Sequence, residues 1–117
     1  MRGPHQVIAP HRASYADPIA VRQGQALHVT ERVEVWDGHT WVWASADDGR
    51  SGWVPDTLIQ RDGASAVARY DYSAIELSCA DGARLEVGIA THGWAWCTDA
   101  HGQNGWVPQR NLAPLSH

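Results

Sequence analysis

The sequence predicts an all-β protein built from two small domains, and two observations carry that prediction. A stretch near the middle recurs at an offset of 53 residues, so that residues 41–55 match residues 94–108 at seven of fifteen positions. Six of the seven matches are Trp, Gly or Pro, and a repeat of fixed period indicates a repeated structural unit. Short apolar runs also alternate with turn residues about every eight to twelve positions, without a helical period, which is typical of a small barrel or sandwich.

The length of the chain agrees with two domains. A chain of 117 residues leaves each copy so small that it buries only about 60% of its unfolded surface. We therefore expect the two copies to pack against each other, or to share flanking segments. The predicted boundaries are 1–60 and 64–117, with a short polar linker between them.

The composition argues against several classes of function. The net charge is −4, and all nine basic residues are Arg, which argues against a nucleic-acid groove or an anionic membrane surface as partner. No apolar run is long enough for a signal peptide or a membrane span, so we expect a cytoplasmic location. The absence of Lys indicates a GC-rich bacterial genome. Since the seven His are scattered without ligand-type spacing, we expect neither a metal nor another cofactor.

The first copy alternates short strands with turns. Gln23-Gly24-Gln25 separates two apolar runs, and Asp37-Gly38 is a dipeptide typical of tight hairpins. Pro55 ends a strand because proline cannot donate to a ladder, and residues 56–58 predict a single 3₁₀ turn. We expect strands at 7–9, 19–21, 27–35, 41–44 and 51–54, with a last short strand from Ile59.

The second copy repeats this plan. Asp81-Gly82 separates two apolar runs, as residues 23–25 do in the first copy, and Asn111-Leu112 matches Leu58-Ile59. We expect strands at 67–72, 77–79, 85–87, 94–97 and 104–107.

The second copy resembles an SH3 domain, because four segments occur in the order typical of that family. They are Ala68–Tyr72 for the ALYDY motif, Glu76–Cys79 for the E-L-S-F segment, Asp81–Val87 for the G-D-x-L-x-V segment, and Trp94 with Gly102–Pro108 for the tryptophan and the G-x-x-G-x-[IV]-P ending. The first copy matches from Ile19 to Ile59, without a recognisable ALYDY motif. The whole chain is similar to the small tandem SH3-type proteins of bacteria.

The resemblance implies two five-stranded barrels without catalytic activity, which bind extended proline-rich peptides on a shelf of aromatic residues. A polyproline helix has little entropy left to lose, and it needs flat aromatic faces and an indole N–H donor. In the second copy the implied shelf comprises Tyr70, Tyr72, Trp94 and Pro108, with Trp106 at its edge.

Further positions follow from the same resemblance. Glu76 falls where the family's acidic residue pairs with Arg or Lys of a ligand. In the first copy Tyr15 is the only candidate for the missing aromatic pair, and Pro18 stands at the position of the acid. The implied shelf residues of the first copy are Trp41, Trp53 and Pro55.

The outward tryptophans leave two interpretations open. Strand alternation places Trp94 and Trp96 on one face and Cys97 on the other, and the family places the position of Cys97 in the core. The outward tryptophans then form either a binding surface or a buried face between the repeats. We favour Trp43 and Trp96 for such an interface, and Trp41 and Trp94 for a ligand.

The two cysteines are interpreted as reduced core residues rather than as catalytic groups. Cys79 and Cys97 both align with core positions of the family, where a thiol acts as a small hydrophobe. A nucleophile would pair Cys97 with His92 or His101, but the sequence offers no third group that would orient the base.

Together these observations predict a non-enzymatic protein that binds a protein or peptide ligand. One alternative is a structural adaptor or oligomer whose grooves are occupied by the neighbouring repeat, and this includes self-association. Another is recognition of the cell wall, a role associated with some bacterial SH3-type domains. That role requires export, for which the N-terminus shows no signal.

Overall fold

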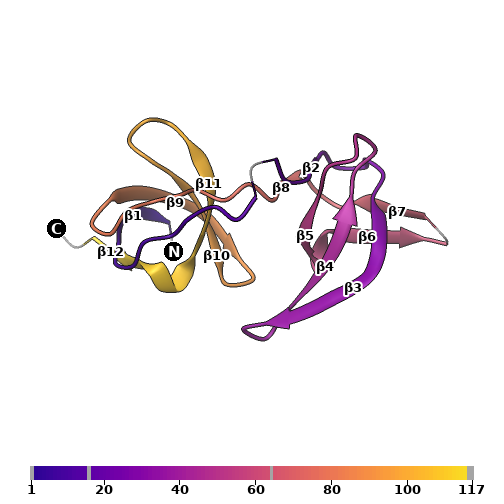
Figure 1. Ribbon diagram of the computed structural model, residues 1–117, viewed down its shortest axis with the longest axis horizontal. Coiled ribbons are helices and arrows are strands. Elements are labelled where there is room, and N and C mark those ends of the chain that lie inside the picture. Colours follow the sequence, from indigo (N-terminus) through magenta and orange to yellow (C-terminus); the bar gives the residue numbers. More distant parts are fainter. Residues whose placement is uncertain (1, 16, 64, 116–117) are drawn as a thin grey trace. The chain divides into compact units, whose positions relative to one another are not determined.

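The computed structural model describes residues 2–15, 17–63 and 65–115, and it confirms the all-β prediction (Figure 1). The described residues form strands and two single-turn 3₁₀ helices, η1 (Asp56–Leu58) and η2 (Gln109–Asn111), and no α-helix. None of their helical segments has the length and apolar character needed to cross a membrane. The strands are β1 (Gly3–Val7), β2 (Ala20–Val21), β3 (His28–Trp36), β4 (His39–Ser45), β5 (Ser51–Pro55), β6 (Ile59–Asp62), β7 (Ser65–Ala68), β8 (Tyr72–Ser73), β9 (Arg84–Thr91), β10 (Trp94–Thr98), β11 (Asn104–Pro108) and β12 (Leu112–Pro114).

The chain divides into two compact units whose limits differ from the predicted boundaries 1–60 and 64–117. Unit 1 consists of Met1–Ala16 together with Ile75–His117, and unit 2 consists of Asp17–Ala74. Each unit therefore combines segments from both sequence repeats. Unit 2 is inserted into the chain of unit 1.

Unit 1 is organised by one five-stranded sheet in the order β11-β10-β9-β1-β12. Strand β1 lies between β9 and β12, with His5 opposite Leu85 and Val7 opposite Leu112. Its core is a cluster of buried apolar side chains, which are Val7, Leu77, Leu85, Val87, Ala95, Cys97, Val107 and Leu112. The first strand of the first repeat is thus an internal strand of the second repeat's barrel.

Unit 2 contains the three-stranded sheet β3-β4-β5, the hairpin β6-β7 and the short pair β2-β8. In the hairpin, Ile59 lies opposite Ala68. The backbone N–H of Leu27 donates to the carbonyl oxygen of Ala66 at 2.9 Å, which joins β7 to the segment that leads into β3. Strand β7 belongs to the second repeat in sequence, but it completes the barrel of the first.

Strands β1 and β7 fill equivalent places in the two units. Val7 lies opposite Leu112 in unit 1, as Ala68 lies opposite Ile59 in unit 2. The N–H of Gly82 donates to the carbonyl oxygen of Val7 at 2.7 Å, as the N–H of Gly24 does to Ala68 at 2.7 Å. The two repeats have therefore exchanged their first strands.

Two tight hairpins follow from pairs of residues with positive φ. Asp37 and Gly38, with φ of 51° and 77°, join β3 to β4, and His92 and Gly93, with φ of 53° and 81°, join β9 to β10. Positive φ at both central residues is the signature of a type I′ turn, whose twist matches the flanking strands. This result confirms the predicted strand extension and tight turn, so that residues 28–45 form a long β-hairpin.

Candidate functional site

The tryptophans of β4 and β10 face outward, as strand alternation and the SH3 resemblance together predict. In β10 the side chains of Ala95 and Cys97 are buried, whereas Trp94 and Trp96 are half-buried. Strand β4 shows the same alternation, because Trp41 is half-buried and Val42 is buried. The aromatic rings therefore lie on the outer faces of the sheets, where a ligand or another protein surface can reach them.

In unit 2 the aromatic residues of both repeats meet. The hydroxyl of Tyr72 donates to the carbonyl oxygen of Trp53 at 3.1 Å. The hydroxyl of Tyr70 hydrogen-bonds to the hydroxyl of Thr57 at 3.0 Å. We call Trp41, Trp53, Tyr70 and Tyr72 the aromatic surface of unit 2.

The members of this surface differ in exposure. Tyr70 is 36% exposed and Tyr72 is 9% exposed, whereas Trp41 and Trp53 are half-buried. Pro55 pairs with Trp41 across β4 and β5. Because Pro55 is buried, it is not accessible to a ligand and is not part of this surface. The indole nitrogen of Trp41 is also buried, so a ligand would meet the ring face of this residue and not its N–H group.

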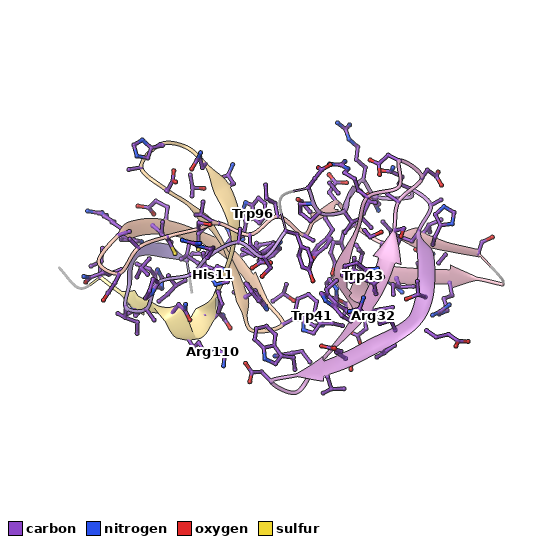
Figure 2. All side chains as sticks on the ribbon, viewed as in Figure 1. His11, Arg32, Trp41, Trp43, Trp96 and Arg110 are labelled. Carbon is purple, nitrogen blue, oxygen red and sulfur yellow. The ribbon has the colours of Figure 1, made fainter. Side chains whose placement is uncertain are left out.

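Arg32, which the sequence analysis did not single out, covers part of the indole cluster of unit 2. Its guanidinium carbon lies 4.8 Å from the ring centroid of Trp43 and 5.0 Å from that of Trp53. The two indoles meet edge to face, with centroids 5.2 Å apart. Figure 2 shows Arg32 beside Trp43. This cation–π stacking holds the two rings in place. The sequence signal that could have revealed it is an Arg on the strand that pairs with β4.

The residues expected around Trp94 are divided between the two units. Glu76, Trp94, Trp106 and Pro108 lie in unit 1, whereas Tyr70 and Tyr72 lie in unit 2. The residues that the resemblance assigns to one shelf of the second copy therefore belong to two different units. Trp106 is 8% exposed and packs edge to face against Trp96, with centroids 5.1 Å apart. Pro108 is buried as well.

In unit 1, His11 stands where unit 2 has Tyr72. His11 forms an antiparallel bridge with Cys79, and Tyr72 pairs with Val21 in the same way. The sequence signal for this equivalence is the spacing, because His11 follows the buried Val7 by four residues, as Tyr72 follows Ala68. The residue type conceals this equivalence, because an imidazole does not resemble the tyrosine of the ALYDY motif.

His11 contacts Glu76 and Trp94, the two predicted site residues of unit 1 that are not buried. Its Nε2 atom lies 2.8 Å from Oε1 of Glu76, and the two side chains are only 15% and 13% exposed. Its ring meets that of Trp94 edge to face at 5.5 Å. The hydroxyl of Ser14 also donates to Oε1 of Glu76, at 3.4 Å. The carboxylate that the resemblance assigns to a ligand is therefore bonded within its own unit.

The cysteines have the character of core residues. Cys97 is fully buried, and its thiol donates to the carbonyl oxygen of Ala95 at 3.4 Å. Burial raises the pKa of the Cys97 thiol to about 11, and burial also raises the pKa of Cys79. A thiol of such high pKa carries almost no thiolate at neutral pH, so Cys97 is not an activated nucleophile. Among residues 2–15, 17–63 and 65–115, no three His, Cys, Asp or Glu residues gather in the manner of a metal site.

Residues 4–61 match the model of the variant SH3 domain family. The chain contains an SH3-type domain. Its two units are SH3-like barrels, and domains of this family mediate interactions with proteins or peptides and are typically non-catalytic. No curated protein and no solved structure matches the chain.

The SH3 match covers the first repeat, in which the sequence analysis found no ALYDY motif. It begins in β1, which lies in unit 1, and continues through β2 to β6 of unit 2. The strand equivalence explains this result, since β1 has the position in unit 1 that β7 has in unit 2. Each SH3-like barrel therefore contains a complete set of strands, although the first strand comes from the other repeat.

Proposed function

We propose that this chain is a non-enzymatic protein- or peptide-binding module, and that unit 2 recognises an extended, proline-rich segment through its aromatic surface. The observation that carries the proposal is the bond from the Tyr72 hydroxyl to the Trp53 carbonyl. It fixes a ring of the ALYDY segment against the strand that carries an outward indole. Rings held in this way lose little entropy when a ligand binds.

A polyproline segment suits this surface on physical grounds. It forms no internal hydrogen bonds and is extended before binding, so it offers prolyl rings to flat aromatic faces at small entropic cost. Tyr70 is the most exposed member of the surface, and the half-buried indoles of Trp41 and Trp53 supply further area. We therefore propose that the ligand lies across Tyr70 and these two indoles.

Unit 1 favours a second role. His11 is bonded to Glu76 and packs on Trp94, and Trp106 and Pro108 are buried. A ligand would have to displace His11 before its own cation could reach the carboxylate. We propose that unit 1 has a structural role and does not itself bind peptide.

The test is a titration of the full chain with pooled proline-rich peptides, followed by amide and indole N–H resonances. The seven tryptophans supply seven indole reporters. Saturable shifts of Trp41 and Trp53, without shifts of Trp94 and Trp106, are expected. Shifts confined to Trp94 and Trp106 would assign the activity to unit 1, and an unchanged spectrum would reject proline-rich ligands.

A matched pair of variants separates binding from folding. Tyr70→Ala removes the most exposed ring of the aromatic surface, and it should weaken the titration while the dispersed spectrum is kept. Tyr15→Ala removes a ring of unit 1 that is 45% exposed, and it should leave the affinity unchanged. Equal affinity of Tyr70→Ala and the wild type would contradict the proposed surface.

A further inference from the structure

Strand β3 has an exposed edge that carries apolar side chains. It is the outer strand of the sheet β3-β4-β5 (Figure 1). In the part of the chain that the structure describes, no strand pairs with the other edge of β3 between residues 30 and 36. Val33 and Val35 are 52% and 72% exposed. An open strand edge with apolar side chains is a template for pairing with another chain.

The register of the hairpin shows which backbone groups face this edge. The two-residue turn makes Trp36 and His39 a hydrogen-bonded pair, and pairs alternate along an antiparallel ladder. The non-hydrogen-bonded pairs are then Val35 with Thr40 and Val33 with Val42. The N–H and C=O groups of Val33 and Val35 therefore point away from β4, toward the open edge.

We propose that this edge pairs with the same edge of a second copy of the chain, antiparallel and centred on Val33. The outward N–H and C=O groups of Val33 would bond to those of Val33 in the second copy, as the ladder requires. The neighbouring pairs place Arg32 opposite Glu34 of the second copy, and Glu34 opposite its Arg32. These are non-hydrogen-bonded pairs, in which side chains come closest and opposite charges attract.

Charge selects this register from the others that the backbone allows. A pairing centred on Val35 would place Arg32 opposite Gly38 of the second copy, so the guanidinium would have no carboxylate opposite it. A pairing centred on Glu31 would lie within the irregularity of the ladder between Val29 and Val33, and it would place two Glu31 carboxylates opposite each other, which is unfavourable. The order Arg32-Val33-Glu34 is self-complementary only when Val33 faces Val33.

The paired segment is short, so the association is weak. A ladder of about five residues per chain buries less than the roughly 1,200 Å² of a standard interface, and the dimer is expected only at high protein concentration. The inference does not rest on peptide binding by the aromatic surface, because the proposed pairing uses the backbone edge of β3. Of its side chains only Arg32 also contacts that surface, at Trp53, whereas the variants of Val33 and Glu34 leave this contact in place.

The test is sedimentation equilibrium of the full chain from ~10 µM to ~1 mM, the range in which small interfaces associate. The wild type should form a dimer. Glu34→Arg places two Arg pairs in contact and should weaken the dimer about tenfold or more. Arg32→Glu should do the same. An equimolar mixture of the two variants should associate again, because every Arg then faces a Glu.

A backbone variant supplies an independent check. Val33→Pro removes an N–H that does not bond to β4, so the hairpin is kept while the central pair of the dimer is lost. It should abolish association while the spectrum of the folded monomer is retained. It also decides the question if Arg32→Glu, which removes the stack on Trp43, does not fold.

Three outcomes would overturn the proposal. One is a wild type that remains monomeric at the highest concentration. Protection of the Val33 amide from exchange in that monomer would show that another segment of the same chain covers the edge. The second is a dimer that Glu34→Arg and Val33→Pro do not weaken, because its interface then lies elsewhere. The third is a mixture that associates no better than the single variants.

Discussion

The hydroxyl of Tyr72 donates to the carbonyl oxygen of Trp53 at 3.1 Å, although the two residues belong to different sequence repeats. The bond exists because β7, which precedes Tyr72, pairs with β6 of the first repeat. It ties the ALYDY segment of one repeat to the Gly-Trp-Val-Pro strand of the other. The aromatic surface of unit 2 is therefore a product of strand exchange.

The Tyr72 bond should contribute measurably to stability. Tyr72→Phe keeps the ring and leaves the carbonyl of Trp53 without this donor, so we expect a loss of about 1 kcal/mol in the free energy of unfolding. Tyr70→Phe is the control, since its bond to Thr57 is exposed and should cost less than about 0.5 kcal/mol. Urea denaturation followed by tryptophan fluorescence measures both values, and equal losses would contradict the structural difference.

Strand exchange is directly testable by cross-linking. Gln6 lies opposite Ala113 across β1 and β12, so the double variant Gln6→Cys/Ala113→Cys should form an intramolecular disulfide. In an arrangement without exchange, Gln6 would instead lie opposite Gln60 of β6, and Gln6→Cys/Gln60→Cys should therefore not cross-link. Peptide mapping by mass spectrometry distinguishes the two products. Cross-linking of the second pair alone would mean that β1 pairs within its own repeat.

Gly105 should be intolerant of a side chain. A Cβ atom there would lie 2.5 Å from the backbone nitrogen of Leu77 and 2.7 Å from the carbonyl carbon of Glu76, so Gly105→Ala should destabilise unit 1 by about 1–3 kcal/mol. Gly88→Ala is the control, because its nearest neighbour would be the Trp96 carbonyl oxygen at 3.6 Å. Thermal unfolding of both variants measures the difference, and a Gly105→Ala protein as stable as the wild type would contradict this close approach.

The Cys97 thiol should make stability depend on pH in the alkaline range. Its pKa rises from 9.0 to about 11 on burial, so the folded state favours the neutral thiol. The stability that this thiol contributes is therefore complete below pH 9 and is lost as the pH rises through about 11. Cys97→Ala removes this dependence while lowering stability at every pH by leaving a small cavity. Urea denaturation of both proteins at pH 8 and pH 10.5 should therefore show that their difference narrows at the higher pH. A constant difference would mean that the thiol does not titrate as a buried group.

The stacking of Arg32 on Trp43 and Trp53 should contribute a little to the stability of unit 2. Arg32→Gln removes the cation from Trp43 and Trp53, and an exposed cation–π contact contributes about 0.5–1 kcal/mol. Arg22→Gln, on an exposed turn of the same unit, should change stability less. Thermal unfolding measures the loss, and acrylamide quenching of fluorescence should increase only in Arg32→Gln. Unchanged quenching would contradict the coverage of these indoles.

Several elements could be predicted from local sequence because their causes are local. Asp37-Gly38 specifies a two-residue hairpin, and period-2 alternation places Cys97 and Trp96 on opposite faces. The SH3 resemblance then identifies the face of Cys97 as the inner one. The 3₁₀ turn after Pro55 is likewise confirmed. His11 and Arg32 escaped notice because their importance depends on partners in other strands, Glu76 for the first and two indoles for the second.

The sequence by itself determined the two repeats and most of the strands and turns, although the strand expected at 77–79 is replaced by isolated bridges. Together with the SH3 resemblance it also determined the outward direction of the tryptophans. Only the tertiary structure decided that β1 pairs with β9 and β12 while β7 pairs with β6. The physical reason is that alternation specifies the face of a strand that is buried but not the strand beside it. Val7 and Ala68 meet the same local requirement, so either strand suits either barrel by pattern alone. The choice between them is made by long-range packing, and it groups Tyr70 and Tyr72 with Trp53.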